Sequence, residues 1–170
     1  MIETRDLILD KPQYDDWKNM YINLWSQDES AKYMLWRTTK TEENAKIRIE
    51  KNIAYMARHP ESYLVYEKSS GEAIGFAGME QIAENAYEDT GIAIGPRFVR
   101  IGYGKQILIA LVEQACKKYG ATEFICSCRN ANVASAKLQI SCGFIYTYSE
   151  ERKDPYTREN YILDVYKLKM

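Results

Sequence analysis

The sequence is poor in the residues that build metal centres and membrane spans. It contains one histidine, His59, and its four cysteines form no C-x-x-C pair, so we expect no metal site. No apolar run approaches the about 18 to 20 residues that a membrane-spanning helix needs. The opening segment, residues 1–6, lacks the apolar stretch of a secretory signal peptide. We therefore expect a cytoplasmic protein without a membrane contact.

An excess of charge of one sign is also missing. The 23 Lys and Arg against 24 Asp and Glu give a net charge of -1, and no basic stripe is present, which argues against a nucleic-acid partner. The four cysteines lie late in the chain in apolar contexts, and we expect them to be buried, reduced thiols of a cytosolic protein: Cys116, Cys126, Cys128 and Cys142. The length fits one domain over residues 1–170, as a monomer or a homodimer.

The first half of the chain predicts one strand, two helices and three further strands. Apolar alternation marks a strand at residues 7–9, and helical spacing predicts a helix that begins near Pro12 and carries Tyr14 to Leu24. A second helix follows Thr41 and ends at Pro60. Residues 63–66 and 73–79 form a predicted hairpin, and residues 87–94 form another strand.

The second half predicts alternating helices and strands. Residues 105–119 form a helix that is apolar on almost every side and therefore deeply buried, and Gly120 ends it. A strand at 123–128, a helix at 132–142 and strands at 144–148 and 161–169 follow. The order is β-α-α-β-β-β-α-β-α-β-β, which predicts an α/β fold with a mostly antiparallel mixed sheet of six to seven strands and helices on both faces.

The turn before the buried helix is the most informative stretch, and it reads G-P-R-F-V-R-I-G-Y-G-K over residues 95–105. Its glycines allow positive φ and the close approach of another group. The free N–H groups and the dipole at a helix start attract anions, and Arg97, Arg100 and Lys105 add positive charge. The turn predicts a site for a phosphate-bearing ligand, with a tight structural turn as the alternative.

Two better-known phosphate motifs do not fit this turn. A P-loop needs Ser or Thr after Gly-Lys and a glycine five residues earlier, whereas this chain has Gln106 and Val99 there. A dinucleotide fingerprint needs a third glycine where the chain has Ile107.

The same stretch resembles the acetyl-CoA-binding segment of GNAT N-acetyltransferases. The pattern I-x-I-x-P-x-F-x-x-x-G-Y-G over residues 92–104 is similar to that segment, whose signature is Gln/Arg-x-x-Gly-x-Gly/Ala. N-x-x-S at 132–135, Gly143-Phe144 and T-R-D-L-I-L at 4–9 resemble the branch of the ribosomal-protein N-terminal acetyltransferases. Val99 departs from the Gln/Arg position, and Gln139 stands where many relatives have a tyrosine acid.

The resemblance implies a GNAT fold whose sheet is splayed between the fourth and fifth strands. The pantetheine arm of acetyl-CoA, the expected cosubstrate, would enter this gap, and the pyrophosphate would lie against the glycine turn. Asn132 is equally a candidate helix N-cap. The implied cofactor-binding residues are Ile92, Ala93, Ile94, Val99, Arg100, Ile101, Gly102, Tyr103, Gly104, Lys105, Asn132 and Ser135.

The implied chemistry is direct attack of a neutral amine on the thioester, and a base or a water path must remove the amine proton. Asp89 and Glu80 are the candidate bases, and a solvated strand-end acid is the alternative for Asp89. Tyr146 and Tyr103 are candidates for protonating the thiolate, as is water. A backbone N–H near Ile94 is the candidate oxyanion donor.

The acceptor is expected to be a small-molecule amine or a protein N-terminus. Its pocket is expected near the first two helices and the hairpins, where Tyr33, Trp36 and Arg37 cluster in a loop. These three residues either contact the substrate or only anchor the loop. Two other functions stay open. One is a CoA-binding regulatory domain without catalysis, and the other is a nucleotide-binding interaction module.

Overall fold

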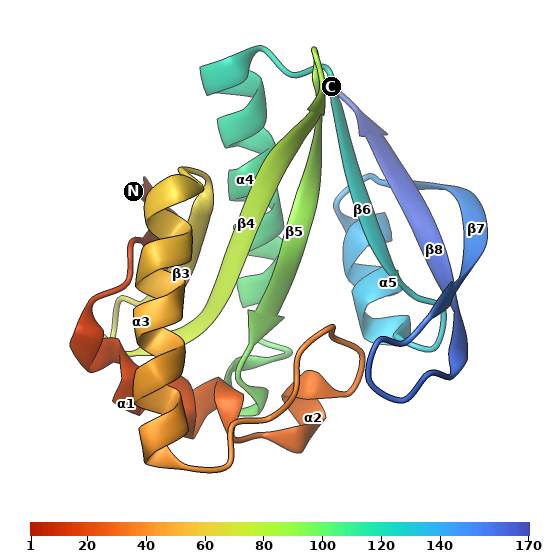
Figure 1. Cartoon of the computed structure of the whole chain (residues 1–170). Coiled ribbons are helices and arrows are strands. Elements are labelled where there is room, and N and C mark those ends of the chain that lie inside the picture. Colours follow the sequence, from red (N-terminus) through yellow and green to blue (C-terminus); the bar gives the residue numbers. More distant parts are fainter.

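One open sheet runs through the computed structural model, which describes residues 1–170 (Figure 1). Its eight strands follow the order β1-β2-β3-β4-β5-β6-β8-β7. The strands are β1 (Ile2–Glu3), β2 (Leu7–Asp10), β3 (Ser62–Glu67), β4 (Ala73–Ala83), β5 (Ala86–Ile94), β6 (Glu123–Arg129), β7 (Ile145–Lys153) and β8 (Asn160–Lys169). The helices are α1 (Trp17–Met20), α2 (Asp28–Ala31), α3 (Glu42–Arg58), α4 (Tyr103–Tyr119) and α5 (Val133–Ser141).

The predicted mostly antiparallel mixed sheet is confirmed, but it has one strand more than the six to seven expected. The extra strand is β1, which pairs Ile2 with Leu9 and Glu3 with Ile8. Thr4 closes this small hairpin, because its hydroxyl accepts the Leu7 N–H at 3.1 Å. Two residues are too few to produce an alternation signal, so the strand could not be recognised from the pattern.

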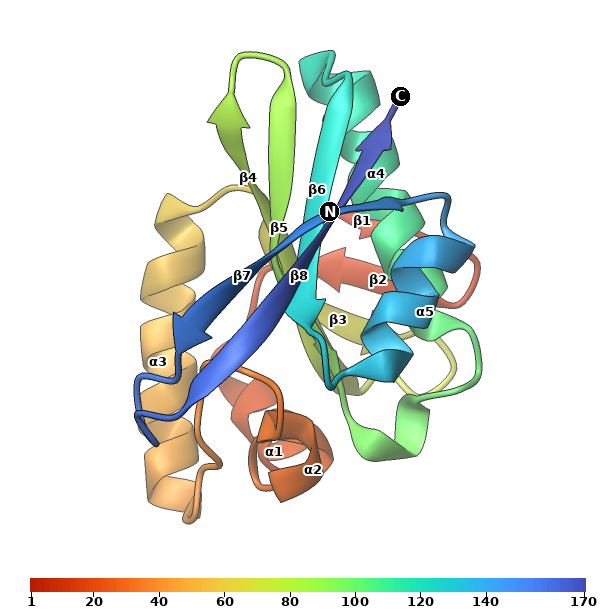
Figure 2. The ribbon, with the colours of Figure 1, turned by 90° about the vertical axis from the view of Figure 1, so that its right-hand side faces the viewer.

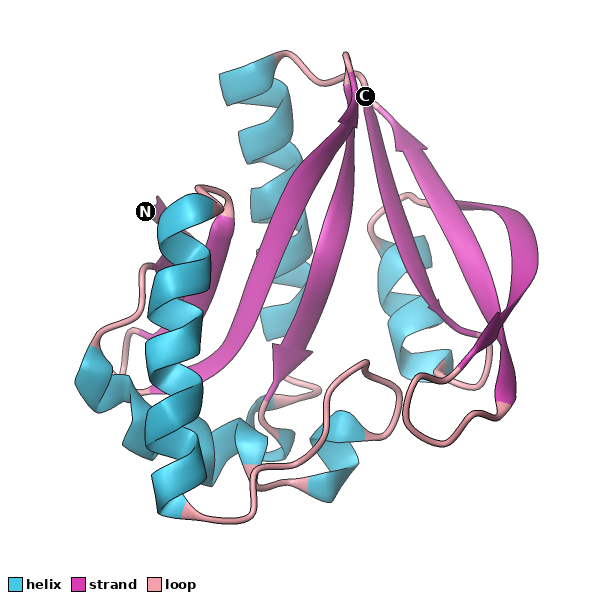
Figure 3. Cartoon of the chain, viewed as in Figure 1, coloured by secondary structure: helices cyan, strands magenta, loops and turns pink.

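Helices cover both faces of the sheet, as predicted (Figure 3). Figure 2 shows α3 on one side of the strands and α4 and α5 on the other. On the α3 side, Ala45, Ile49 and Met56 pack into a core cluster with Trp17 and Met20. On the α4 side, a larger cluster joins the sheet to the helix through Ile107, Leu108, Leu111 and Ala115. Each helix thus buries one stripe against the sheet.

Two helix predictions need correction. The single helix expected after Pro12 is three short segments, a 3-10 turn (Tyr14–Asp16), α1 and a π turn (Tyr21–Trp25). The wide π turn brings the consecutive residues Asn23, Leu24 and Trp25 into the interior, which a regular α-helix would not do. Helix α4 is also not buried all round, because Ile109 on its outer side is 40% exposed.

The cysteine prediction holds for only part of the set. Cys126 and Cys128 are buried, as predicted, and share one face of β6, whereas Cys142 is half-buried. Cys116 is exposed, because it follows Ala115 onto the solvent side of α4. All four are free thiols. No helix of the chain is long and apolar enough to span a bilayer.

The sheet is split between β5 and β6, the fourth and fifth of the strands predicted from the sequence. The two parallel strands pair only at Ala86–Glu123, Tyr87–Phe124 and Glu88–Ile125, and then separate (Figure 1). A register shift against β4 lies at the same level, where Gly78 pairs with Gly91 and Met79 with Asp89. The extra residue bends β5 away from β6. This bend positions the site described next.

Candidate active site

The glycine turn presents a row of free backbone donors at the start of α4. The N–H groups of residues 100–105 find no hydrogen-bond acceptor within the chain. Gly102 has φ +92 and Arg100 has φ +65, so two left-handed residues turn these groups toward one side. Successive N–H groups at a helix N-terminus form an anion-binding concavity. The geometry therefore fits the phosphate-binding role that the sequence predicted.

Beside this turn, the split between β5 and β6 holds a cleft of about 780 Å³, here called the turn cleft. Its walls are β5, the glycine turn, the start of α5 and β6. It brings together ten of the residues predicted to bind the cosubstrate: Ile92, Ala93, Ile94, Val99, Arg100, Gly102, Gly104, Lys105, Asn132 and Ser135. The predicted site residues are therefore neighbours in space as well as in sequence pattern.

Two predicted cofactor-binding residues do not line the turn cleft. The Ile101 side chain is 53% exposed, so only its backbone N–H belongs to the anion site. The Tyr103 hydroxyl donates to Glu67 at 2.6 Å, and this hydrogen bond is the main reason why the pKa of Tyr103 is raised to about 12. Tyr103 therefore anchors α4 to β3 and is a poor proton donor for a thiolate in the cleft.

The floor of the turn cleft depends on close packing of α4 against α5. A Cβ at Gly104 would lie 3.1 Å from Leu138 Cδ2, so glycine lets the two helices approach each other. Lys137, which the sequence analysis did not select, joins Arg100 and Lys105 in lining the cleft. These three cations are suited to the phosphates of a ligand such as CoA.

Asn132 acts as the N-cap of α5, as one of its two interpretations predicted. Its Oδ1 accepts the Ser135 N–H at 3.2 Å, while the residue also lines the turn cleft. The Ser135 hydroxyl accepts the Gln139 side-chain N–H at 3.3 Å. Gln139 Oε1 is buried and without a partner. The cleft thus carries an amide where many relatives have a tyrosine.

Asp89 places a carboxylate at the apex of the split. The residue is half-buried, but its Oδ1 has no exposed surface and no hydrogen-bond partner. Burial, with a smaller contribution from the charge of Glu88, raises the pKa of Asp89 to about 7 against the hydrogen bonds from the Cys126 thiol and the Ser127 and Gly91 backbone. Asp89 is therefore not a solvated strand-end acid, and it is partly deprotonated at neutral pH.

The other catalytic candidates lie away from Asp89 and do not line the turn cleft. Glu80 is exposed on β4, opposite Glu88. Tyr146 is 53% exposed on β7, its ring stands edge-on to Tyr166, and its hydroxyl lies 2.8 Å from Ser149 Oγ. The structure thus brings one of the three predicted catalytic side chains into the cleft.

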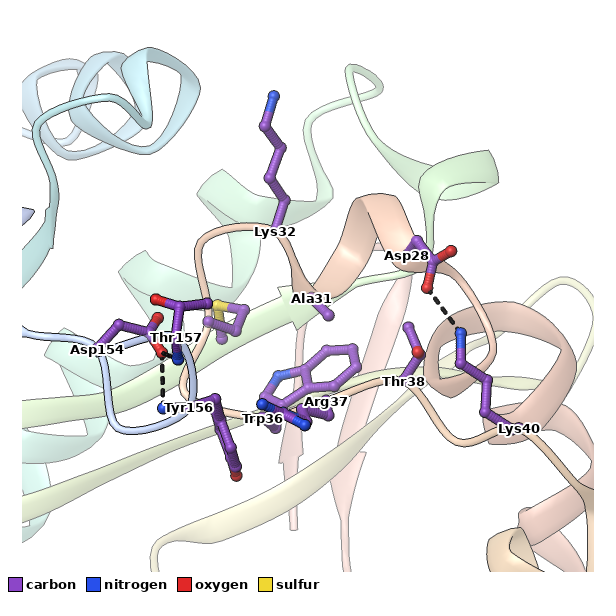
Figure 4. A pocket seen from close by; sticks show the side chains of 11 residues that line it. Asp28, Ala31, Lys32, Trp36, Arg37, Thr38, Lys40, Asp154, Tyr156 and Thr157 are labelled. Carbon is purple, nitrogen blue, oxygen red and sulfur yellow. Dashed lines mark hydrogen bonds and ion pairs between the residues drawn. The ribbon is translucent and has the colours of Figure 1, made fainter. Parts of the chain in front are cut away.

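A second cleft of about 570 Å³, here called the loop cleft, adjoins the first (Figure 4). It lies between the segment 28–40 and the β7–β8 loop at residues 154–157. Lys32 and Met34 line both clefts. A Cβ at Gly91 would lie 3.7 Å from Met34 Cε, so the two clefts meet beside β5, two residues beyond Asp89. Trp36 and Arg37 line the loop cleft, and Tyr33 lines the turn cleft.

The β7–β8 loop is a wall of the loop cleft that the sequence did not reveal. Asp154 shapes this loop by accepting the N–H groups of Tyr156 at 2.8 Å and Thr157 at 3.0 Å. Arg129 donates to the same carboxylate at 2.6 Å. These backbone bonds and the arginine lower the pKa of Asp154 to about 2. The only sequence signal is the D-P-Y-T turn at 154–157, which is common in loops of any function.

The split sheet, the donor-rich turn and the adjoining clefts define a transferase-type site for a phosphate-bearing donor and a second substrate. The sequence model of the acetyltransferase (GNAT) domain family matches residues 6–145, which is most of the chain. The chain therefore belongs to the GNAT acetyltransferase family. No curated protein matches the sequence.

Solved structures show the same fold over almost the whole chain. A GNAT acetyltransferase from Bacillus anthracis superposes with a TM-score of 0.83 at 19% identity, covering 99% of this chain and 97% of its own. An acetyl transferase from Salmonella typhimurium that modifies the N-terminal serine of ribosomal protein L7/L12 gives 0.78 at 16%, covering 98% and 96%. Spermidine N-acetyltransferase from Vibrio cholerae, in complex with CoA and spermine, gives 0.74 at 14%, again covering 98% and 96%.

Proposed function

We propose that this protein is an acetyl-CoA-dependent N-acetyltransferase that acts on a primary amine by direct attack in a ternary complex. The observation that carries the proposal is the desolvated, unpartnered Oδ1 of Asp89 in the turn cleft, two residues before Gly91, where the two clefts meet. A buried carboxylate with a pKa near neutrality is suited to general-base work. The spermidine N-acetyltransferase of the same fold binds CoA and an amine, which supports the class of reaction.

The turn cleft is proposed to hold acetyl-CoA. The pyrophosphate would accept hydrogen bonds from the free N–H groups of residues 100–105, and Arg100 and Lys105 would balance its charge. The pantetheine arm would lie along the unpaired stretch of β5 at Ile92 to Ile94, beyond the last β5–β6 pair. In this arrangement the thioester would lie near the apex of the split, close to Asp89.

The loop cleft is proposed to admit the amine. Its nitrogen attacks the carbonyl carbon of the thioester, a C–N bond forms, and the C–S bond breaks to release CoA thiolate. Asp89 accepts the proton that the amine loses and then passes it to solvent, while the thiolate takes a proton from water. A backbone N–H near Ile94 is proposed to stabilise the oxyanion of the tetrahedral intermediate.

The decisive experiment is a thiol-release assay with acetyl-CoA and a panel of primary amines that includes peptides, amino acids and polyamines. Amine-dependent release of CoA with acetylated product supports the proposal. Tight CoA binding without turnover of any amine would instead indicate a CoA-binding regulatory domain. ATP binding that CoA does not displace would indicate a nucleotide-binding interaction module.

A further inference from the structure

We propose that the acceptor is an anionic amine, meaning a primary amine with one or more carboxylates close to it, and that Arg37 and Lys32 select it. The inference rests on the proposed acetyl transfer and adds the charge of the acceptor to it. It follows from the balance of free and neutralised charges in the loop cleft. A polyamine is the opposite class of acceptor, because its further charges are all positive.

The carboxylates of the loop cleft are already neutralised. Five charged side chains line it, the cations Lys32, Arg37 and Lys40 and the anions Asp28 and Asp154. Asp28 pairs with Lys40 at 3.1 Å. Asp154 is 8% exposed and accepts Arg129 and two backbone N–H groups, so it has no free oxygen for an incoming ammonium group.

Two cations of the loop cleft remain without a carboxylate partner. Neither Arg37 nor Lys32 forms an ion pair within the chain, and both side chains are exposed. Arg37 lies with its Cζ 4.4 Å from the Tyr156 ring centroid, and Lys32 Nζ lies 5.1 Å from that of Tyr33. Figure 4 shows Arg37 beside Tyr156, with Lys32 extending away from that group. The rings hold both cations near the clefts while their charge stays unbalanced.

A third positive charge lies behind the same loop. Arg48 of α3 stands between the rings of Trp25 and Trp36, with centroid distances of 4.7 Å and 4.8 Å. It donates to Thr39 Oγ1 at 3.0 Å and to the Arg37 carbonyl, and no carboxylate pairs with it. Burial lowers the pKa of Arg48 to about 10, so it stays charged at neutral pH. A half-buried charge without a counter-ion favours an anion nearby.

The acidic groups that face the clefts do not offset this charge. Glu29 lines the turn cleft but not the loop cleft, and a single carboxylate can balance only one of the two unpaired cations. Asp89 is the proposed base, so its charge interacts with the reacting amine and does not balance Arg37 or Lys32. An acceptor with its amine at Asp89 and its carboxylates toward Arg37 and Lys32 therefore matches the local charges, whereas a second ammonium group in the loop cleft meets only cations and paired carboxylates.

The test compares matched acceptors in the thiol-release assay. The peptides have equal length and an N-terminal serine, followed by two aspartates, two alanines or two lysines, so their charge changes at positions two and three. Glutamate and spermidine extend the series to small amines. We expect kcat/KM for the acidic peptide to exceed that for the basic peptide by at least about tenfold. The preference should shrink as salt is raised. Activity on glutamate as high as on the acidic peptide would indicate a small acceptor instead of a protein N-terminus.

Arg37→Glu should lower the acidic-to-basic preference by on the order of tenfold or more while the affinity for CoA is unchanged. Lys51→Glu is the matched control, because Lys51 is exposed on α3, lines neither cleft and gives the same change of net charge. Equal kcat/KM for all three peptides in the native protein, or a preference that Arg37→Glu leaves unchanged, would overturn the inference.

A binding measurement keeps the test independent of turnover. Calorimetry of the CoA-saturated protein with the N-acetylated acidic and basic peptides should show tighter binding of the acidic one, and Arg37→Glu should weaken it. If no amine is acetylated but this difference is found, the proposed transfer fails and the anion preference stands. If amines react but neither binding nor kcat/KM depends on peptide charge, the transfer stands and the anion preference fails.

Discussion

Asp89 has a buried, unpartnered carboxylate oxygen and a pKa of about 7, and we propose that it is the general base. The Asp89→Asn variant keeps the shape of the side chain and removes its basicity. We expect kcat to fall by roughly a hundredfold near pH 7 while the dissociation constant of CoA is unchanged. Steady-state kinetics with calorimetry of CoA binding separates the two effects. Wild-type turnover of Asp89→Asn between pH 6 and 9 would leave water as the proton acceptor.

The raised pKa of Asp89 also predicts that the stability of the fold decreases as the pH rises, whereas the activity should increase. The pKa of Asp89 is about 7 in the folded protein and near 3.8 when unfolded, so the folded state holds its proton more tightly. Its contribution to the free energy of unfolding is therefore complete below pH about 4 and is lost as the pH rises through about 7. In urea unfolding, the free energy of unfolding of Asp89→Asn should increase relative to that of the wild type between pH 4 and pH 8. Parallel curves would show that Asp89 is solvated in solution.

Gly102 is the residue at which the anion site can be blocked most selectively. Its φ of +92 favours glycine, and a Cβ there would meet no atom within 4 Å, so a side chain fits if the backbone strain is tolerated. Gly102→Asp should fold and lose about a hundredfold or more in CoA affinity, because its carboxylate faces the pyrophosphate. Gly102→Ala, which adds the strain without the charge, is the control. Unchanged CoA affinity in folded Gly102→Asp would place the pyrophosphate elsewhere.

At the scale of elements, the loop cleft depends on how segment 28–40 is held against α3. Arg48→Met keeps an apolar stem between Trp25 and Trp36 but removes the bonds to Thr39 and to the Arg37 carbonyl. We expect faster amide hydrogen exchange in residues 33–40 and a KM for the amine that is about tenfold higher, with unchanged CoA affinity. Lys51→Met on the same helix is the control. Unchanged exchange in residues 33–40 would show that the tryptophans alone hold the loop.

The elements also show what the sequence could and could not predict. The β5–β6 split, the glycine turn and the stripe of α3 were accessible because each rests on local residues or on a family resemblance. The π turn at Tyr21–Trp25 was not, because its spacing resembles that of an α-helix until three consecutive side chains are seen to be buried. The β7–β8 wall was not accessible either, because the pairing of Arg129 with Asp154 joins residues from different strands and loops.

For the whole molecule, contacts between residues that are far apart in the sequence explain why the proposed donor side was easier to predict than the proposed acceptor side. The proposed donor site is built mainly from one continuous stretch, residues 91–105, together with parts of β6 and α5. The proposed acceptor side combines α2 and the loop after it, within residues 28–40, with the β7–β8 loop at residues 154–157, and these two segments are far apart in the sequence. The charge of this cleft therefore becomes apparent only in the folded chain, where Arg37 and Asp154 line it and Arg48 lies behind Trp36.

The two halves of the split sheet also predict how the ligand affects stability. The turn cleft is formed by β5, α4, β6 and α5 together, so it exists only in the folded chain. Acetyl-CoA at 100 times its dissociation constant should therefore stabilise the fold by about 2.7 kcal/mol. For a domain of this size the melting temperature should rise by roughly 5 to 10 °C. Differential scanning calorimetry with Gly102→Asp as the control measures this rise. An equal rise with ATP at the same concentration, or a rise that persists in Gly102→Asp, would contradict a specific CoA site at the glycine turn.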